Sequence, residues 1–111
     1  MRSTFLPPVE QSPLTVPYNT NATAQRNQVL TRYLITCQRY RHRAIDLDQL
    51  QTDTWLTSLS LVDDPRLAGF LSLAEQRFGE LKKEDPQTAH PLALILVEAA
   101  EKLTLKRIAF R

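Results

Sequence analysis

The side chains with the clearest chemical potential lie in one short segment, Gln38-Arg39-Tyr40-Arg41-His42-Arg43. Basic residues that alternate with an aromatic ring can bind phosphates and stack on bases, and the same arginines can contact carboxylates on a protein. A solvated helix face that balances acids elsewhere is the simplest interpretation. Binding of an acidic protein surface and binding of nucleic acid are the two functional interpretations.

The net charge of only +2 hides an uneven distribution, because the stretch from Gln11 to Ile45 contains five arginines and no acid. On a helix, Arg32, Arg39 and Arg43 fall on the side opposite the apolar residues. Arginine outnumbers lysine ten to four, and arginine suits fixed bidentate protein contacts at least as well as phosphate binding. The modest net charge and the lack of a helix-turn-helix pattern favour a protein partner over nucleic acid.

Catalytic and metal-binding patterns are missing from the sequence. Hydrolysis needs a nucleophile, a base and an orienting group, whereas the only histidines are His42, within the basic segment, and His90, before a proline. His90 is interpreted as a helix-capping residue. One cysteine and two distant histidines give no zinc spacing, so we expect neither a metal site, a cofactor nor an enzymatic activity.

The single cysteine, Cys37, lies among apolar residues and is predicted to be a buried, unreactive thiol. The N-terminus shows no secretory signal, and the longest apolar run, Leu92 to Val97, is far too short to span a bilayer. A cytoplasmic location without a membrane span is therefore the expectation.

Residues 1–20 are predicted to form an extended arm, because four prolines disfavour regular helix there. The arm is unusual for a linker because apolar side chains interleave with the prolines. Such an arm either packs on its own domain or docks on a partner. Its candidate partner-binding residues are Phe5, Leu6, Val9, Leu14 and Tyr18.

Residues 21–111 carry the periodicity of a small all-α domain. The first helix is expected to begin after Asn21 or Thr23 and to run to Ala44, with Tyr40 on its apolar stripe and also among the candidate partner-binding residues. Asp46 predicts the cap of a shorter second helix with an irregular apolar pattern. Asp64 followed by Pro65 predicts the start of the third helix.

The last helix is expected to open around residues 88–91, with Pro91 near its start. In the third helix Phe70 and Phe78 are predicted to be buried. The predicted core stripe of the last helix consists of Leu92, Ile95, Leu96, Ala99, Ala100 and Leu103.

Together these patterns predict a small antiparallel helical bundle, with three long helices and one short one, behind an extended N-terminal arm. The expected function is a non-catalytic protein–protein interaction module, such as an adaptor, an assembly factor or a small subunit of a complex. It would act through the apolar arm and the arginine-rich face. A nucleic-acid-binding regulator using the same basic helix is the alternative, and self-association is compatible with either.

Overall fold

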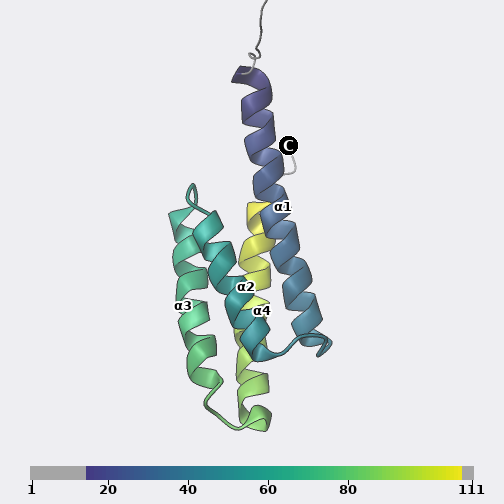
Figure 1. The fold of residues 1–111 in the computed structure, drawn as a ribbon, viewed down its shortest axis with the longest axis vertical. Coiled ribbons are helices and arrows are strands. Elements are labelled where there is room, and N and C mark those ends of the chain that lie inside the picture. Colours follow the sequence, from purple (N-terminus) through teal and green to yellow (C-terminus); the bar gives the residue numbers. More distant parts are fainter. Residues whose placement is uncertain (1–14, 109–111) are drawn as a thin grey trace, which may run out of the picture.

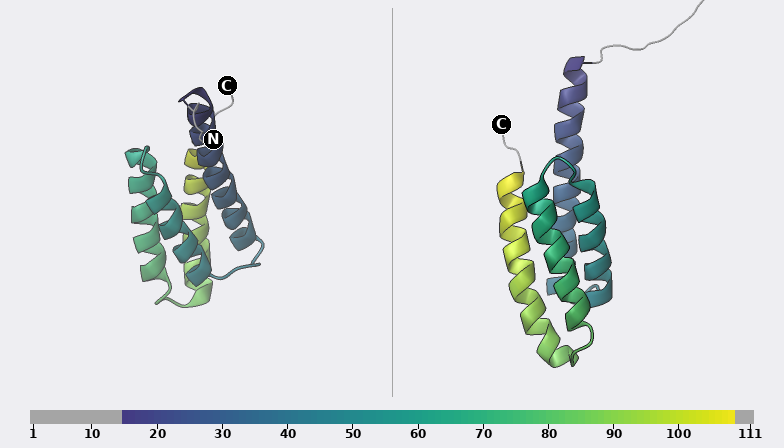
Figure 2. Two further views of the ribbon diagram at one scale, coloured as in Figure 1. Left: turned by 45° about the horizontal axis from the view of Figure 1, so that its top comes forward. Right: turned by 90° about the vertical axis from the view of Figure 1, so that its left-hand side faces the viewer.

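The computed structural model describes the backbone of residues 15–108 and the side chains of residues 23–108. Within that range the chain forms four helices, α1 (Thr15–Arg41), α2 (Leu47–Ser60), α3 (Pro65–Leu81) and α4 (Pro86–Arg107), and no strand. The predicted all-α class is confirmed. The chain reverses direction at each connection, as Figures 1 and 2 show. Each helix packs against two others, so α4 returns to contact α1.

Helix α1 begins at Thr15, seven residues before the earliest predicted start, which is the residue after Asn21, so residues 15–20 of the predicted extended arm are helical. Pro17 is tolerated because it lies in the first turn, where backbone amides have no acceptor within the helix, and because its fixed φ is already helical. The first turns of α1 project beyond the ends of the other three helices (Figure 1). Residues 1–14 lie outside the described residues.

The predicted caps of the second and third helices are confirmed. The Asp46 carboxylate accepts a hydrogen bond from the Gln49 amide (2.9 Å), and the Asp64 carboxylate accepts one from the Leu67 amide (3.2 Å). Each acid satisfies an amide that the first helical turn leaves without a partner. Pro65 follows Asp64 at the first helical position, where its missing amide hydrogen costs nothing.

Helix α4 begins at Pro86, five residues before the proline that was expected near its start. Pro86 therefore starts α4, and Pro91 lies inside it. An internal proline removes one backbone hydrogen bond, here the bond to the Gln87 carbonyl. Because Gln87 and Pro91 are both exposed, that carbonyl faces solvent and is not buried without a partner.

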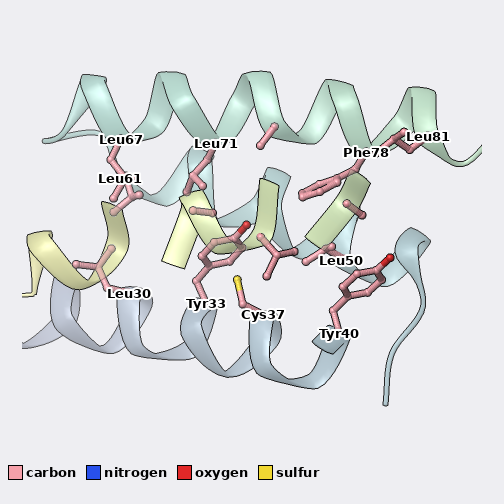
Figure 3. Packing of buried hydrophobic residues seen from close by; sticks show 14 of the residues in the cluster. Leu30, Tyr33, Cys37, Tyr40, Leu50, Leu61, Leu67, Leu71, Phe78 and Leu81 are labelled. Carbon is pink, nitrogen blue, oxygen red and sulfur yellow. The ribbon is translucent and has the colours of Figure 1, made fainter. Parts of the chain in front are cut away.

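All four helices contribute to one apolar core, and Figure 3 shows side chains of α1 and α3 pointing toward each other across it. The predicted core stripe of α4 is confirmed at Ala100 and in part at Leu96 and Leu103, which pack partly buried against the core, but it is wrong at Leu92 and Ile95, which are 42% and 64% exposed. The other buried apolar residues of α4 are Ala89, Ala93 and Val97. Small side chains on the buried face let α4 approach the large residues of α1 and α3 closely. The remaining buried apolar residues are Leu30, Tyr33, Cys37, Tyr40, Leu50, Leu61, Leu67, Leu71, Ala74, Phe78 and Leu81.

Helix α1 ends in a Schellman motif. The Ala44 amide donates to the Arg39 carbonyl (2.8 Å) and the Arg43 amide donates to the Tyr40 carbonyl (3.0 Å). Arg43 takes the left-handed position of this motif with φ 60°, a conformation that glycine usually supplies. Arg43 is therefore not on the helix that carries Arg32 and Arg39.

Phe78 and Phe70 should respond differently to truncation. Phe78 is fully buried, whereas Phe70 is only partly buried against the core, so only one of the two predicted core positions is fully enclosed. We expect Phe78→Ala to lower the free energy of unfolding by about 3–5 kcal/mol. Phe70→Ala should cost clearly less in the same urea titration. Equal losses would contradict this packing.

Replacing Arg43 by glycine should stabilise the fold. A left-handed residue that carries a Cβ costs about 1–2 kcal/mol relative to the helical conformation, and glycine avoids that cost. We expect Arg43→Gly to raise the free energy of unfolding by about 1 kcal/mol in urea denaturation. Arg43→Ala is the control, because alanine removes the guanidinium but keeps the Cβ, and it should gain nothing. A loss of stability in the glycine variant would show that contacts of the arginine side chain outweigh the strain.

Candidate functional site

The residues with catalytic potential are not brought together. His42 is exposed just after the end of α1, and His90 lies on α4. Among the side chains of residues 23–108, no three His, Cys, Asp or Glu side chains lie close enough to hold a metal ion. In the described helices no segment is both long and apolar enough to cross a membrane.

Cys37 is fully buried in the core, as its apolar setting predicted. Burial, and next the negative charge of Glu101, raise the pKa of the thiol to about 12. The thiol is therefore protonated at neutral pH, and the thiolate form that reacts is rare. Cys37 acts as a small apolar side chain between α1 and its neighbours (Figure 3).

His90 is packed against Tyr40, which overturns the prediction that His90 caps a helix. The His90 Nδ1 and the Tyr40 hydroxyl share a hydrogen bond of 3.1 Å, so His90 links α4 to α1 and does not cap a helix. Burial, and then the positive charge of Arg43, lower the pKa of His90. Tyr40 is only 5% exposed, so it belongs to the core and offers little surface to a partner.

Asp64 joins helices α1, α3 and α4 at one end of the bundle. Its Oδ2 accepts hydrogen bonds from Arg26 of α1 (2.9 Å) and from Arg107 of α4 (2.7 Å), while the same carboxylate caps α3. Burial tends to raise the pKa of Asp64, but the Leu67 amide and the two arginines outweigh it, so the pKa lies below its ordinary value. These residues are structural, and their arginines are not free for a partner.

Glu101 plays a similar part earlier on α4, before Arg107. The residue is 8% exposed, and its carboxylate accepts hydrogen bonds from Arg41 Nε (2.9 Å) and Gln38 Nε2 (3.0 Å), both on α1. A buried carboxylate needs such partners because desolvation alone would disfavour its charge. Arg41, at the centre of the basic segment, is thereby engaged within the fold.

The predicted arginine face is divided by the structure. Arg32 and Arg39 are exposed on α1, two turns apart, and form no ion pair with any described residue. Arg43 lies past the helix end and lines a different hollow, near Tyr40 and His90. Only Arg32 and Arg39 therefore share a surface.

The outer side of α2 carries large apolar residues that point away from the core. On that helix Leu50 and Thr54 are buried, while Trp55, Leu56 and Leu59 are 48%, 48% and 56% exposed. Val62, just past the helix end, is 88% exposed. Such residues occur singly on many surfaces, and a group of them on one helix is a candidate interaction site.

A hollow of about 410 Å³ lies between α1 and α2, and Leu56 is the exposed apolar residue of α2 that lines it. Val29 and Ile35 of α1 and Leu56 of α2 supply its apolar lining, and Arg32 and Arg39 also border it. We call the surface formed by these residues the α1–α2 face, and we include Leu59, which lies one turn beyond Leu56 on α2. Its members are Val29, Arg32, Ile35, Arg39, Leu56 and Leu59.

The α1–α2 face is held in place by polar contacts beneath it. The Tyr33 hydroxyl and the Thr54 hydroxyl are 2.9 Å apart in the core, and Thr36 donates to Asp53 across the two helices (3.3 Å). Thr54 also donates to the Leu50 carbonyl (2.7 Å), so its hydroxyl is satisfied within its own helix. The relative position of α1 and α2 is thus fixed before any partner binds.

Sequence reasoning found the two arginines but missed the apolar part of this face. The signal was present, because Leu56 and Leu59 follow helical spacing. A second apolar stripe consists of Leu47, Leu50 and Leu61. The two stripes alternate in the sequence, and together they produce the irregular apolar spacing of the second helix. The apolar arm residues Phe5, Leu6, Val9 and Leu14 lie outside the described residues, and nothing is described of the Tyr18 side chain.

Comparison with known proteins adds no further information, because no family model, no curated protein and no solved structure matches the chain.

Removing the charge of Asp64 should destabilise the protein in a pH-dependent way. Asn can still cap α3, so Asp64→Asn tests the ion pairs alone. A depressed pKa means that Asp64 stabilises the fold above the ordinary value of about 3.9 and that this contribution is lost as the pH falls through the lower folded value. We expect a loss of about 2 kcal/mol at neutral pH in urea denaturation.

The difference between Asp64→Asn and the parent should therefore shrink in acid. Asp63→Asn is the matched control, because Asp63 also lies near Arg26 (3.3 Å) but its side chain is 62% exposed. Exposed pairs contribute little, so this control should change stability by less than about 0.5 kcal/mol. Equal losses from the two variants would contradict the role given to Asp64.

Proposed function

We propose that this protein is a non-catalytic protein-interaction module, an adaptor, assembly factor or small subunit of a complex, built on an antiparallel helical bundle. The single observation that carries the proposal is the α1–α2 face. There Leu56 of α2 and Ile35 of α1 are each 48% exposed and line one hollow, and Leu59, one turn beyond Leu56, is 56% exposed. A protein partner covers such residues, whereas solvent leaves their apolar surface hydrated.

The energetic argument depends on how much apolar surface remains. Burying a whole leucine or isoleucine side chain contributes about 1.5–3 kcal/mol. A side chain that is half exposed keeps roughly half of that contribution for a partner, or about 1 kcal/mol. Leu56, Leu59 and Ile35 therefore suffice for a moderate gain on binding.

The rigidity of the face supports the same function. The Tyr33–Thr54 contact is buried and fixes α2 against α1. A preformed surface loses little conformational entropy when a partner docks, so more of the contact energy contributes to affinity. The proposal retains the N-terminal arm, residues 1–14, as a second contact, and a cytoplasmic location, for which the buried unpaired Cys37 is the support.

Nucleic-acid binding through the basic helix is the alternative. Of the five arginines in the basic stretch, Arg26 and Arg41 are engaged by acids of the same chain. Arg43 is separated from Arg32 and Arg39, which leaves two adjacent charges to neutralise phosphates. Nucleic-acid affinity rests largely on the number of such contacts, so the geometry favours a protein partner.

Site-specific photocrosslinking in cells tests this function. A benzoylphenylalanine at position 59 should give discrete adducts that survive nuclease treatment and disappear with protease treatment. The control is the same replacement at Leu73 of α3, which is 67% exposed but lies outside the α1–α2 face. Adducts of the same pattern at both positions, or adducts at position 59 that nuclease removes, would reject the proposed function.

A further inference from the structure

We infer that residues 1–14 fold back along α1 and that Phe5 and Leu6 occupy the hollow between α1 and α2 until a partner displaces them. The docking of this arm is a property of the chain itself, whereas its role as a cover of the α1–α2 face rests on the proposed function. Once displaced, the arm is free to make the second contact of that proposed function. The inference follows from the length of chain before α1, the reach of its apolar residues and the lining of the hollow.

The length of the arm brings Phe5 to the level of the hollow. Helix α1 begins at Thr15, and its wall of the hollow runs from Val29 to Arg39, or from about 21 Å to about 36 Å along the helix. A proline-rich chain extends about 3.1 Å per residue, so Phe5, ten residues before Thr15, reaches about 31 Å. If three residues serve to reverse the chain direction, Phe5 reaches about 22 Å. Phe5 is level with the hollow in both cases, and Leu6 is its neighbour.

The other hollow, near Tyr40 and His90, is too far away for these side chains. Tyr40 lies 25 residues after Thr15 in the same helix, or about 38 Å along its axis. Ten residues of fully extended chain span at most about 36 Å, even if no residue is used for the reversal. Of these two hollows, only the one between α1 and α2 is therefore within reach of Phe5.

The lining of the hollow suits an uncharged apolar occupant. Val29, Ile35 and Leu56 supply apolar surface from both helices. The two arginines of the face and Asp53 place charges of both signs on the walls, so an occupant with one sign of charge would be attracted by some groups and repelled by others. Residues 3–8 of the arm carry no charge and include both Phe5 and Leu6. This segment can contact the apolar lining without opposing either charge.

The prolines of the arm allow an extended occupant. An extended chain needs partners for its amides and carbonyls, but both walls are helices whose own backbone groups are paired within each helix. Pro7 and Pro8 have no amide hydrogen, and a proline-rich chain can keep its carbonyls in solvent. Proline also holds the preceding residue extended, so the chain loses less conformational entropy when it docks.

The covalent link to α1 makes a small contact sufficient. Two apolar side chains would bind only weakly if the segment were a separate molecule. A short tether gives an effective concentration in the millimolar range, so a dissociation constant of about 1 mM is enough to populate the docked arm. A contact of this strength also leaves the arm displaceable by a partner that offers a larger apolar surface.

Disulfide trapping in the full chain tests the docking. Thr4→Cys places a thiol beside Phe5 without removing an apolar side chain, and the same reach places it between about residue 32 and about residue 38 of α1. Arg32→Cys and Arg39→Cys, each combined separately with Thr4→Cys, supply a second thiol at the border of the hollow. The native Cys37 does not compete, because it is buried and its pKa is about 12.

Thr31→Cys and Gln38→Cys are the matched controls for the two arginine positions. Each residue is exposed and directly precedes one of the arginines, but it lies about 100° around the helix and does not line the hollow. In a glutathione buffer, the fraction of intramolecular disulfide gives the effective concentration of the two thiols. We expect this concentration to be at least tenfold higher at one or both arginine positions than at the matched control.

Variants of the arm test which side chains make the contact. Phe5→Ser with Leu6→Ser should lower trapping at the arginine positions to that of the controls. Val9→Ser should leave trapping unchanged, because Val9 reaches only between about residue 21 and about residue 27, before the hollow begins. Mass spectrometry of the intact chain distinguishes an intramolecular disulfide from a disulfide-linked dimer, and thermal unfolding verifies that each variant retains the fold.

Three outcomes would overturn the docking. They are equal trapping at the arginine and control positions, trapping that persists after Phe5→Ser with Leu6→Ser, and a linked dimer, which would place the arm on a second copy of the chain. None of these measurements involves a partner. The docking can therefore fail while protein adducts at position 59 still support the proposed function, and trapping without such adducts would support the docking alone.

The role of the arm as a cover has its own test in the crosslinking experiment. Phe5→Ser with Leu6→Ser should increase the yield of protein adducts at position 59, because the partner no longer competes with the arm. Val9→Ser is again the control and should leave the yield unchanged. An unchanged or lower yield in the double variant would reject the covering role, even where trapping shows that the arm docks.

Discussion

The buried carboxylate of Asp64 is the interaction on which the arrangement of the helices most depends. It caps α3 through the Leu67 amide and accepts hydrogen bonds from Arg26 and Arg107, so one side chain joins the start of α3 to α1 and to the end of α4. The carboxylate is costly to bury, and only the combination of amide and guanidinium donors makes its charge favourable there. Glu101 repeats the principle six residues before Arg107 on α4, where it accepts hydrogen bonds from Gln38 and Arg41 of α1. These two acids thus pair with arginines that, from the sequence alone, would be expected to be free to bind a partner.

This internal pairing explains why the functional surface is smaller and more defined than the charge pattern suggests. Once Arg26 and Arg41 are engaged, Arg32 and Arg39 remain as the adjacent exposed pair. These two arginines belong to the candidate binding surface because α2 places apolar residues beside them. A surface with a few apolar contacts and two charges recognises a partner by shape and by charge, whereas a broad basic face would attract any polyanion.

Helix α2 illustrates a local conflict that the tertiary structure resolves. Its inward side includes Thr54, which is buried and satisfied by Tyr33 and the Leu50 carbonyl, while Trp55 and Leu59 face solvent. For stability alone the opposite distribution would be better, since apolar groups gain from burial and hydroxyls do not. Departures of this kind occur where a sequence serves a function besides folding.

The sequence by itself determined the helical class, the caps at Asp46 and Asp64 and the burial of Cys37, because these follow from local propensity and from apolar spacing within one element. The sequence could not decide where α1 and α4 begin, since proline occurs both in the first turn of a helix and just after the end of one. It also could not decide which stripe of α4 faces the core. Leucine and alanine stripes both have helical period, and only the close approach of α1 and α3 selects the smaller residues. The sequence revealed only half of the candidate site, for the same reason. Arg32 and Arg39 were evident from their charge. Their apolar neighbours come from a different helix, and only the packing of α1 against α2 brings the two groups together.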